Sequence, residues 1–117
     1  MIIKASRITA SSGHTPLYRH LLKTDENEYV HVLKGRENDF AQAIRDAEST
    51  GRKYGLRHVV FSPDETLKDG QFDALERMFR DEFHADEPLY IVEHKKCRSD
   101  GSTAPHYQVV YAECLEN

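Results

Sequence analysis

Hydrophobic positions along this chain repeat with two different periods. Strand-like alternation or short continuous apolar runs occur at residues 2–9, 29–33, 56–62, 89–94 and 106–112. Apolar residues at helical spacing lie between them, at residues 16–23, 38–49 and 71–84. The pattern therefore predicts the element order βαβαβαββ.

Several residues mark where these elements begin and end. Thr15 and Pro16 predict a helix start, because threonine suits the N-cap and proline suits the first helical position. Asn38 is expected to cap the second helix, and Gly51 follows it where a C-terminal cap belongs. Pro63 is expected to end the third strand.

The apolar faces of the helices and the last two strands indicate how the chain packs. The residues expected to face inward from the helices are Leu17, Tyr18, Leu21, Leu22, Phe40, Ala43, Ile44, Ala47, Phe72, Leu75, Met78, Phe79 and Phe83. Residues 89–94 and 106–112 flank a polar loop and can pair as a hairpin, so we expect a mainly antiparallel sheet. We expect one α+β domain over residues 1–117, with the helices on one face of the sheet and the other face open to a ligand.

Length and composition limit the class of protein. The chain has 117 residues, of which 38% are hydrophobic and 31% charged, and no apolar run approaches the ~20 residues of a membrane span. Residues 1–7 do not resemble a signal peptide, because a charge follows only two apolar residues. Cys97 and Cys114 have no metal-type spacing, and we expect them as free thiols in the cytoplasm.

The net charge argues against general binding to nucleic acid, whereas the histidine content suggests chemistry. The net charge of −4 argues mildly against binding to nucleic acid through a general basic field, although a local basic groove is compatible with it. Seven histidines are many for this length, and they are the first compositional indication of chemistry.

The last two predicted strands place three possible metal ligands together. Side chains alternate along a strand, so His106 and Gln108 share one face. If the strands pair around their loop, His94 lies opposite His106, with Cβ atoms about 4.5–5.5 Å apart. Two imidazoles and an amide oxygen can hold a divalent cation and leave positions open for water or phosphate. Histidines on neighbouring strands also occur as ordinary polar surface residues, so spacing alone leaves both interpretations open.

These residues resemble the metal-binding region of plasmid mobilisation relaxases, the HUH-type single-strand DNA nucleases that start conjugative transfer. In that family a histidine closes one strand and a His-x-His pair follows on the next, as in residues 90–96 and 106–110 here. The resemblance continues, in family order, through residues 1–4, 17–22 and 56–63. It implies a relaxase-like fold for nearly the whole chain.

The resemblance also implies a mechanism. A tyrosine hydroxyl attacks a phosphodiester at the transfer origin, forms a 5′-phosphotyrosine and frees a 3′-hydroxyl. A divalent cation such as Mg²⁺ or Mn²⁺, held here by His94, His106 and Gln108, polarises the scissile phosphate. Tyr18 is the candidate nucleophile. The implied partners are single-stranded DNA at a transfer origin and accessory mobilisation proteins.

The chain departs from the family pattern in three places. Gln108 replaces the second histidine of the pair, and a neutral amide is a poorer ligand for transition metals than imidazole. The family's tyrosine usually directly precedes the Leu-Leu pair, where this chain has His20, and Tyr18 lies about 200° away around the helix. Relaxase domains usually continue well past the position of Asn117, so we expect either a piece of a longer domain or a shortened relative, with weak cleavage or none.

Basic and aromatic residues suggest a DNA groove. The cations that could line it are Arg52, Lys53, Arg57, Lys95, Lys96 and Arg98, with Tyr107 or Tyr111 offering faces for base stacking. A solvated charged surface is the plainer interpretation of the same residues. His58 is expected either beside the site, as in the family, or as a structural histidine held by a hydrogen bond.

Three classes of function remain open at this stage. The first is a metal-dependent DNA strand transferase. The second is a non-catalytic DNA-binding or accessory module that keeps the fold without a full metal site and tyrosine. The third is a small α+β protein-interaction domain, which would bind neither metal nor single strands.

Overall fold

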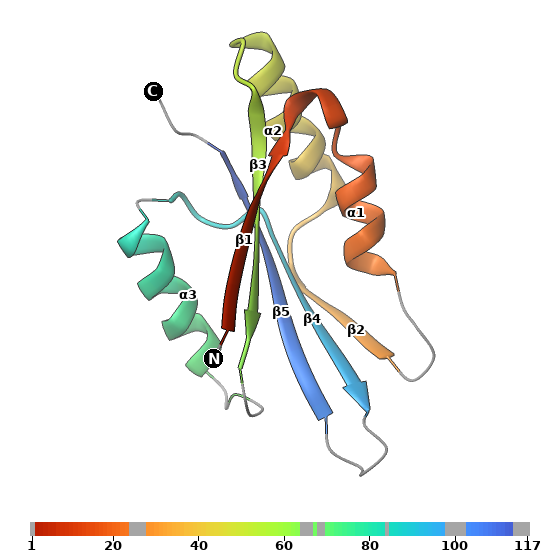
Figure 1. Ribbon diagram of the computed structural model, residues 1–117, viewed down its shortest axis with the longest axis vertical. Helices are drawn as coiled ribbons and strands as arrows, with labels where there is room; N and C mark the ends of the chain where they lie inside the picture. Colours follow the sequence, from red (N-terminus) through yellow and green to blue (C-terminus); the bar gives the residue numbers. More distant parts are fainter. Residues whose placement is uncertain are drawn as a thin grey trace.

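Alternating strands and helices build a five-stranded sheet with three helices in the computed structural model (Figure 1). The structure describes residues 2–23, 28–63, 67, 70–83, 85–97 and 103–113. The strands are β1 (Ile2–Thr9), β2 (Glu28–Lys34), β3 (Tyr54–Ser62), β4 (Tyr90–Cys97) and β5 (Thr103–Ala112). The helices are α1 (Thr15–Leu22), α2 (Glu37–Ser49) and α3 (Gln71–Glu82). The predicted element order and α+β class are confirmed.

Every pairing in the sheet is antiparallel, and the strand order is β1-β3-β5-β4-β2. The hairpin predicted from the last two strands forms as β4 and β5, with Tyr90 opposite Val110. The third strand, β3, lies between β1 and β5, although neither is its neighbour in sequence. Strands from opposite ends of the chain therefore lie on either side of β3.

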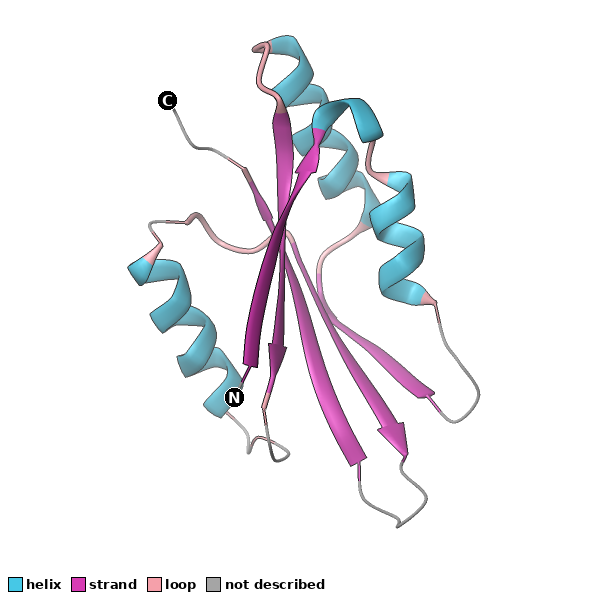
Figure 2. Cartoon of the chain, in the orientation of Figure 1, coloured by secondary structure: helices cyan, strands magenta, loops and turns pink. Residues whose placement is uncertain are grey.

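The prediction that all helices cover one face is wrong. α1 and α2 pack on one face with Val92 and Val110, whereas α3 packs on the other with Ile91 and Val109 (Figure 2). The reason lies in β4 and β5, which carry apolar residues at both odd and even positions. A sheet with two apolar faces must be covered on both to remove them from water.

Helix α3 differs from its predicted orientation in detail. Phe72 and Phe79 are buried as expected, but Met78 is 70% exposed and Phe83 is 52% exposed. Glu76 is buried instead, with its carboxylate accepting a hydrogen bond from Tyr111 Oη at 2.9 Å and pairing with Arg80 at 3.0 Å. An ion-paired, hydrogen-bonded carboxylate can replace an apolar contact at this interface.

Two helix starts are shifted from their predicted caps. α1 begins at Thr15 itself, with His14 in the cap position, and α2 begins before Asn38 with Arg36 as its cap. The carboxylate of Asp39 accepts a hydrogen bond from the Arg36 backbone N–H at 3.1 Å, which satisfies one donor at this helix start. No helix in the described part of the chain is long and apolar enough to cross a membrane.

Candidate functional site

The three predicted metal ligands share one face of the sheet. His94 on β4 lies directly opposite His106 on β5, and Gln108 is two residues further along, opposite Val92. Directly opposed residues point to the same side, and this is the side that α1 and α2 cover in part. The predicted pairing of the two histidine-bearing strands is therefore confirmed.

The donor atoms of these three side chains nevertheless engage three different partners. His94 is 4% exposed, and its Nε2 donates to the Leu21 carbonyl oxygen at 2.6 Å. His106 is exposed, and its Nδ1 lies 2.9 Å from Ser62 Oγ. Gln108 Oε1 lies 2.8 Å from His58 Nε2.

These contacts bear on the predicted metal site. Within the described residues, no three His, Cys, Asp or Glu side chains gather as a ligand group. Sharing one cation would require Gln108 Oε1 to leave His58 and His94 Nε2 to leave the Leu21 carbonyl. Metal binding by His94, His106 and Gln108 stays a prediction.

His58 is held by a hydrogen bond, as one of the two alternatives from the sequence expects, and its partner is the predicted ligand Gln108. Gln108 Oε1 can only accept, so His58 Nε2 carries the proton and its Nδ1 is the unprotonated nitrogen. Burial lowers the pKa of His58 below 6.5; the hydrogen bond to Gln108 opposes this shift, and the nearby His20 adds to it. His58 is therefore a neutral imidazole at pH 7, held in one tautomer.

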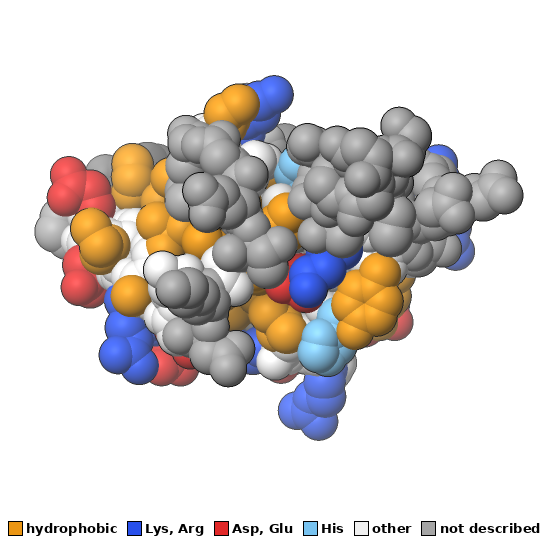
Figure 3. Space-filling view, turned by 90° about the horizontal axis from the view of Figure 1, so that it is seen from below, with side chains coloured by type: hydrophobic (Ala, Val, Ile, Leu, Met, Phe, Trp, Pro, Cys, Tyr) orange, Lys and Arg blue, Asp and Glu red, His pale blue; other side chains and the backbone are white. Residues whose placement is uncertain are grey.

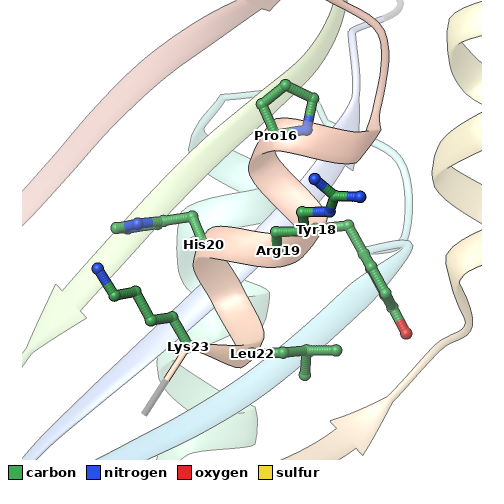
Figure 4. Close-up of a pocket in the computed structure, with 6 residues that line it drawn as sticks. All are labelled: Pro16, Tyr18, Arg19, His20, Leu22 and Lys23. Carbon is green, nitrogen blue, oxygen red and sulfur yellow. The ribbon is translucent and has the colours of Figure 1, made fainter. Parts of the chain in front are cut away.

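His20 joins His58 from helix α1. The two ring centroids are 6.2 Å apart and the rings are nearly perpendicular. Figure 4 shows that His20 and Lys23 point to one side of α1, while Tyr18 and Leu22 point to the other. The residue that directly precedes the Leu-Leu pair thus faces His58, and it points away from Tyr18 as the angular argument from sequence implies.

Tyr18 belongs to the aromatic core instead. Its ring centroid lies 5.6 Å from that of Phe40 and 5.9 Å from that of Tyr90, both in edge-to-face contact. Burial raises the pKa of Tyr90 to about 12, and the charge and hydrogen bond of Tyr18 contribute to the shift. Tyr18 as nucleophile stays a prediction, but its packing directs the ring away from His20 and His58.

Arg57 and Lys95, two of the predicted DNA-binding cations, lie far apart and each has a carboxylate partner, and a DNA groove at these residues stays a prediction. Arg57 pairs with Glu113 at 3.2 Å, and Lys95 pairs with Glu93 at 3.6 Å. Their partners across β5 are Tyr111 and Pro105, six residues apart (111 − 105), which is about 20 Å along a strand. Arg98 and the side chain of Lys96 lie outside the described residues.

The two tyrosines proposed as stacking platforms are buried under α3. Tyr107 is 4% exposed and stacks on Phe72 with ring centroids 4.2 Å apart. Tyr111 is 1% exposed, and its hydroxyl donates to Glu76. Their faces are occupied by the protein's own core, so the interpretation of them as base-stacking residues is wrong.

An open area remains on the face that carries the histidines. Ser6 lies opposite His58, and Lys4 lies two residues along β1 on the same side. Lys4, Ser6 and His106 are exposed, and His58, Ser62 and Gln108 are half-buried. We call this area, together with the neighbouring helix residue, the histidine face: Lys4, Ser6, His20, His58, Ser62, His106 and Gln108. In the view of the whole molecule from below, histidine, hydrophobic, basic and acidic side chains all reach the surface (Figure 3).

Sequence reasoning underrated His20 and His58 in this set. His20 was notable only as a departure from the family pattern, although its angle from Tyr18 already separates the two side chains. No sequence signal pairs β3 with β5, so the contact between His58 and Gln108 was not predictable. Comparison of the chain with models of known protein families gave no match, and searches of curated proteins and of solved structures likewise gave none.

Proposed function

We propose that this chain is a relaxase-like module that binds single-stranded DNA across the histidine face. The observation that carries the proposal is the meeting of His20, His58 and Gln108, which come from three of the five segments on which the relaxase resemblance rests. Nothing in the spacing of these segments along the chain requires them to meet. Their meeting on a partly open sheet face supports a shared binding role.

The chemistry of this face suits a single strand. The imidazole, amide and hydroxyl groups of His106, Gln108 and Ser62 can donate and accept hydrogen bonds with phosphate oxygens and base edges. Lys4 on β1 and Lys23, which lies on the His20 side of α1, are exposed cations that favour a phosphate backbone. A neutral His58 also avoids the desolvation cost that a charged imidazole would carry under a bound strand.

Binding without cleavage is the form of this function that the geometry favours. Tyr18 packs against Phe40 and Tyr90, and the donor atoms of the predicted metal ligands are engaged by protein groups. In-line attack needs a nucleophile at the scissile phosphate. With Tyr18 in the aromatic core, its hydroxyl is not in position to attack a phosphate on the histidine face.

Metal-assisted nicking and strand transfer at a transfer origin is the second candidate. The direct opposition of His94 and His106 is the observation that favours it. A divalent cation such as Mg²⁺ or Mn²⁺, bound after the local hydrogen bonds rearrange, would neutralise charge on the scissile phosphate. In that case the protein acts in plasmid mobilisation, together with accessory mobilisation proteins.

DNA binding is tested by fluorescence anisotropy with a labelled single strand and the matching duplex. We expect tighter binding of the single strand, and we expect His20→Ala with His58→Ala to weaken it by about tenfold or more. His31→Ala is the matched control, because His31 is exposed and lies opposite Glu93, on the other face. Equal loss in the control, or no saturable binding by the wild-type chain, would overturn the proposal.

Cleavage is tested separately with the same strand and Mg²⁺ or Mn²⁺. Denaturing electrophoresis detects a covalent protein–DNA adduct, and we expect none at Tyr18. An adduct that the Tyr18→Phe variant fails to form would establish the nicking function in place of binding alone.

A further inference from the structure

A basic cavity lies on the opposite face of the sheet, at the turn that leads from α2 into β3. Its volume is about 430 Å³, and it is lined by residues 50–54 together with Arg7 and Glu113. Arg57 and His58 are neighbours on β3, so their side chains point to opposite faces. We call this cavity the arginine pocket; it is separate from the histidine face.

A single buried carboxylate organises two of the arginines beside the pocket. Glu113 is 5% exposed, and its Oε2 accepts from Arg7 Nε and from Arg57 Nε at 3.2 Å each. Its Oε1 accepts from Arg57 Nη2 at 3.4 Å. One negative charge therefore holds two guanidinium groups, which leaves one positive charge in excess.

Two further cations have no carboxylate partner within the part of the chain that the structure describes. Arg52 donates to Thr50 Oγ1 and to the Glu113 carbonyl oxygen, both at 2.9 Å, and both acceptors are neutral. Lys53 lies 5.4 Å from the ring centroid of Tyr54. Among the described residues, no carboxylate forms an ion pair with Arg52 or Lys53. The cluster thus combines four cations with one carboxylate, an excess of three positive charges.

The arginines are held in place before any ligand arrives. The Arg7 guanidinium carbon lies 3.9 Å from the ring centroid of Tyr54, and Arg52 is fixed by its two hydrogen bonds. Guanidinium groups bind phosphate oxygens through paired N–H donors. Because these side chains are already ordered, little conformational entropy remains to be lost on binding.

The C-terminal end of α2 would repel an anion bound here, but hydrogen bonds to its carbonyl groups reduce this repulsion. The end of a helix carries partial negative charge on its free carbonyl groups. Three of these accept hydrogen bonds: Asp46 O from Thr50 Oγ1 at 2.8 Å, Ala47 O from Arg52 N at 2.8 Å, and Glu48 O from Gly51 N at 3.1 Å. The net excess of three positive charges therefore dominates the local field.

We propose that the arginine pocket binds a phosphate group. The group belongs either to a free phosphomonoester, such as a nucleotide, or to the backbone of a nucleic-acid strand. Both present the oxygens that paired guanidinium donors recognise, and the proposal does not depend on DNA binding at the histidine face.

Calorimetric titration at constant ionic strength tests this with three probes: inorganic phosphate, thymidine monophosphate and a short thymidine oligonucleotide. We expect saturable binding of at least one probe by the wild-type chain. We expect Arg52→Gln with Lys53→Gln to weaken that binding by about tenfold or more, because both uncompensated cations are lost. Circular dichroism establishes that the variant is folded, and Lys53→Gln alone provides a milder change, since the Lys53 side chain contacts the Tyr54 ring without a hydrogen bond in the described structure.

Arg45→Gln is the matched control, because Arg45 is exposed on α2, outside the pocket, and its loss changes the net charge in the same direction. Binding of phosphate and nucleotide identifies a free phosphomonoester as the ligand, whereas binding of the oligonucleotide alone identifies a strand backbone. The proposal is overturned if no probe binds saturably, or if the pocket variants bind as tightly as Arg45→Gln. Variants at His20 and His58 leave this binding unchanged if the two sites are independent.

Discussion

His58 on β3 donates a hydrogen bond of 2.8 Å to Gln108 on β5, so the amide oxygen predicted as a metal ligand is bound by an imidazole from the adjacent strand. The contact ties a half-buried neutral histidine to the strand that carries His106. Gln108 Oε1 can either accept the hydrogen bond from His58 or coordinate a cation. The chemistry of this face depends on which of these two contacts it makes.

Replacing that amide by an imidazole should favour the cation. We predict that Gln108→His tightens the binding of Mn²⁺, Ni²⁺ or Zn²⁺ by about 10–100-fold, because imidazole is the better ligand for these ions. Calorimetric titration measures the change, and affinity should fall below about pH 6, where ligating imidazoles become protonated. His106→Ala in the same background is the control; if it binds metal as well as its parent, the metal site is not at these residues.

Tyr18 provides the second prediction. Tyr18→Phe should leave single-strand affinity unchanged within about twofold, because the ring packs in the core rather than on the histidine face. The same change should lower the pKa of Tyr90 from about 12 toward its ordinary value, since the hydrogen bond and charge of Tyr18 both help to raise it. Burial remains the largest cause, so the return should be partial. Ultraviolet titration of tyrosine ionisation measures this shift, and an unchanged titration would place Tyr18 away from Tyr90.

The lowered pKa of His58 predicts a loss of stability in mild acid. Between the folded-state pKa and the ordinary histidine pKa of 6.5, the unfolded chain binds more protons at this position than the folded chain. The free energy of unfolding therefore falls as pH drops below about 6.5, by at most about 1.4 kcal/mol per pH unit, and levels off below the folded pKa. Urea unfolding at several pH values measures the slope.

The contribution of His58 is isolated by comparing variants. His58→Gln should show a shallower fall with decreasing pH than the wild-type chain. His31→Gln, at an exposed histidine of β2, should follow the wild-type curve. A slope that His58→Gln leaves unchanged would contradict the burial argument.

Helix α3 allows a test of which helix face meets the sheet. Phe79 is 8% exposed and contacts the rings of Phe61 and Tyr111, so Phe79→Ala should lower the free energy of unfolding by about 3–5 kcal/mol. Met78, its neighbour in sequence, is 70% exposed, and Met78→Ala should change stability by less than about 0.5 kcal/mol. Chemical denaturation compares the two directly, and a large effect at Met78 would mean that α3 packs in another orientation.

The sequence alone was sufficient for the local elements and for one pairing. The strand predicted at residues 2–9 forms over Ile2–Thr9, and every other element appears in its predicted order. Hydrophobic periodicity reports the local backbone state directly, because side chains repeat every two residues in strands and about every 3.6 in helices. The opposition of His94 and His106 follows from the same rule, since a short loop between adjacent strands favours a hairpin.

Only the tertiary structure decided which helix covers each face of the sheet and which strands that are distant in sequence pair. Ile91 and Val92 are adjacent on β4 and both buried, and periodicity alone does not say which helix covers each of them. The position of β3 between β1 and β5 places His58 beside Gln108. The placement of α1 directs His20 toward His58 and Tyr18 into the aromatic core. These contacts depend on strand order and helix docking, which are set by burying both apolar sheet faces at once rather than by the spacing of residues within any one segment.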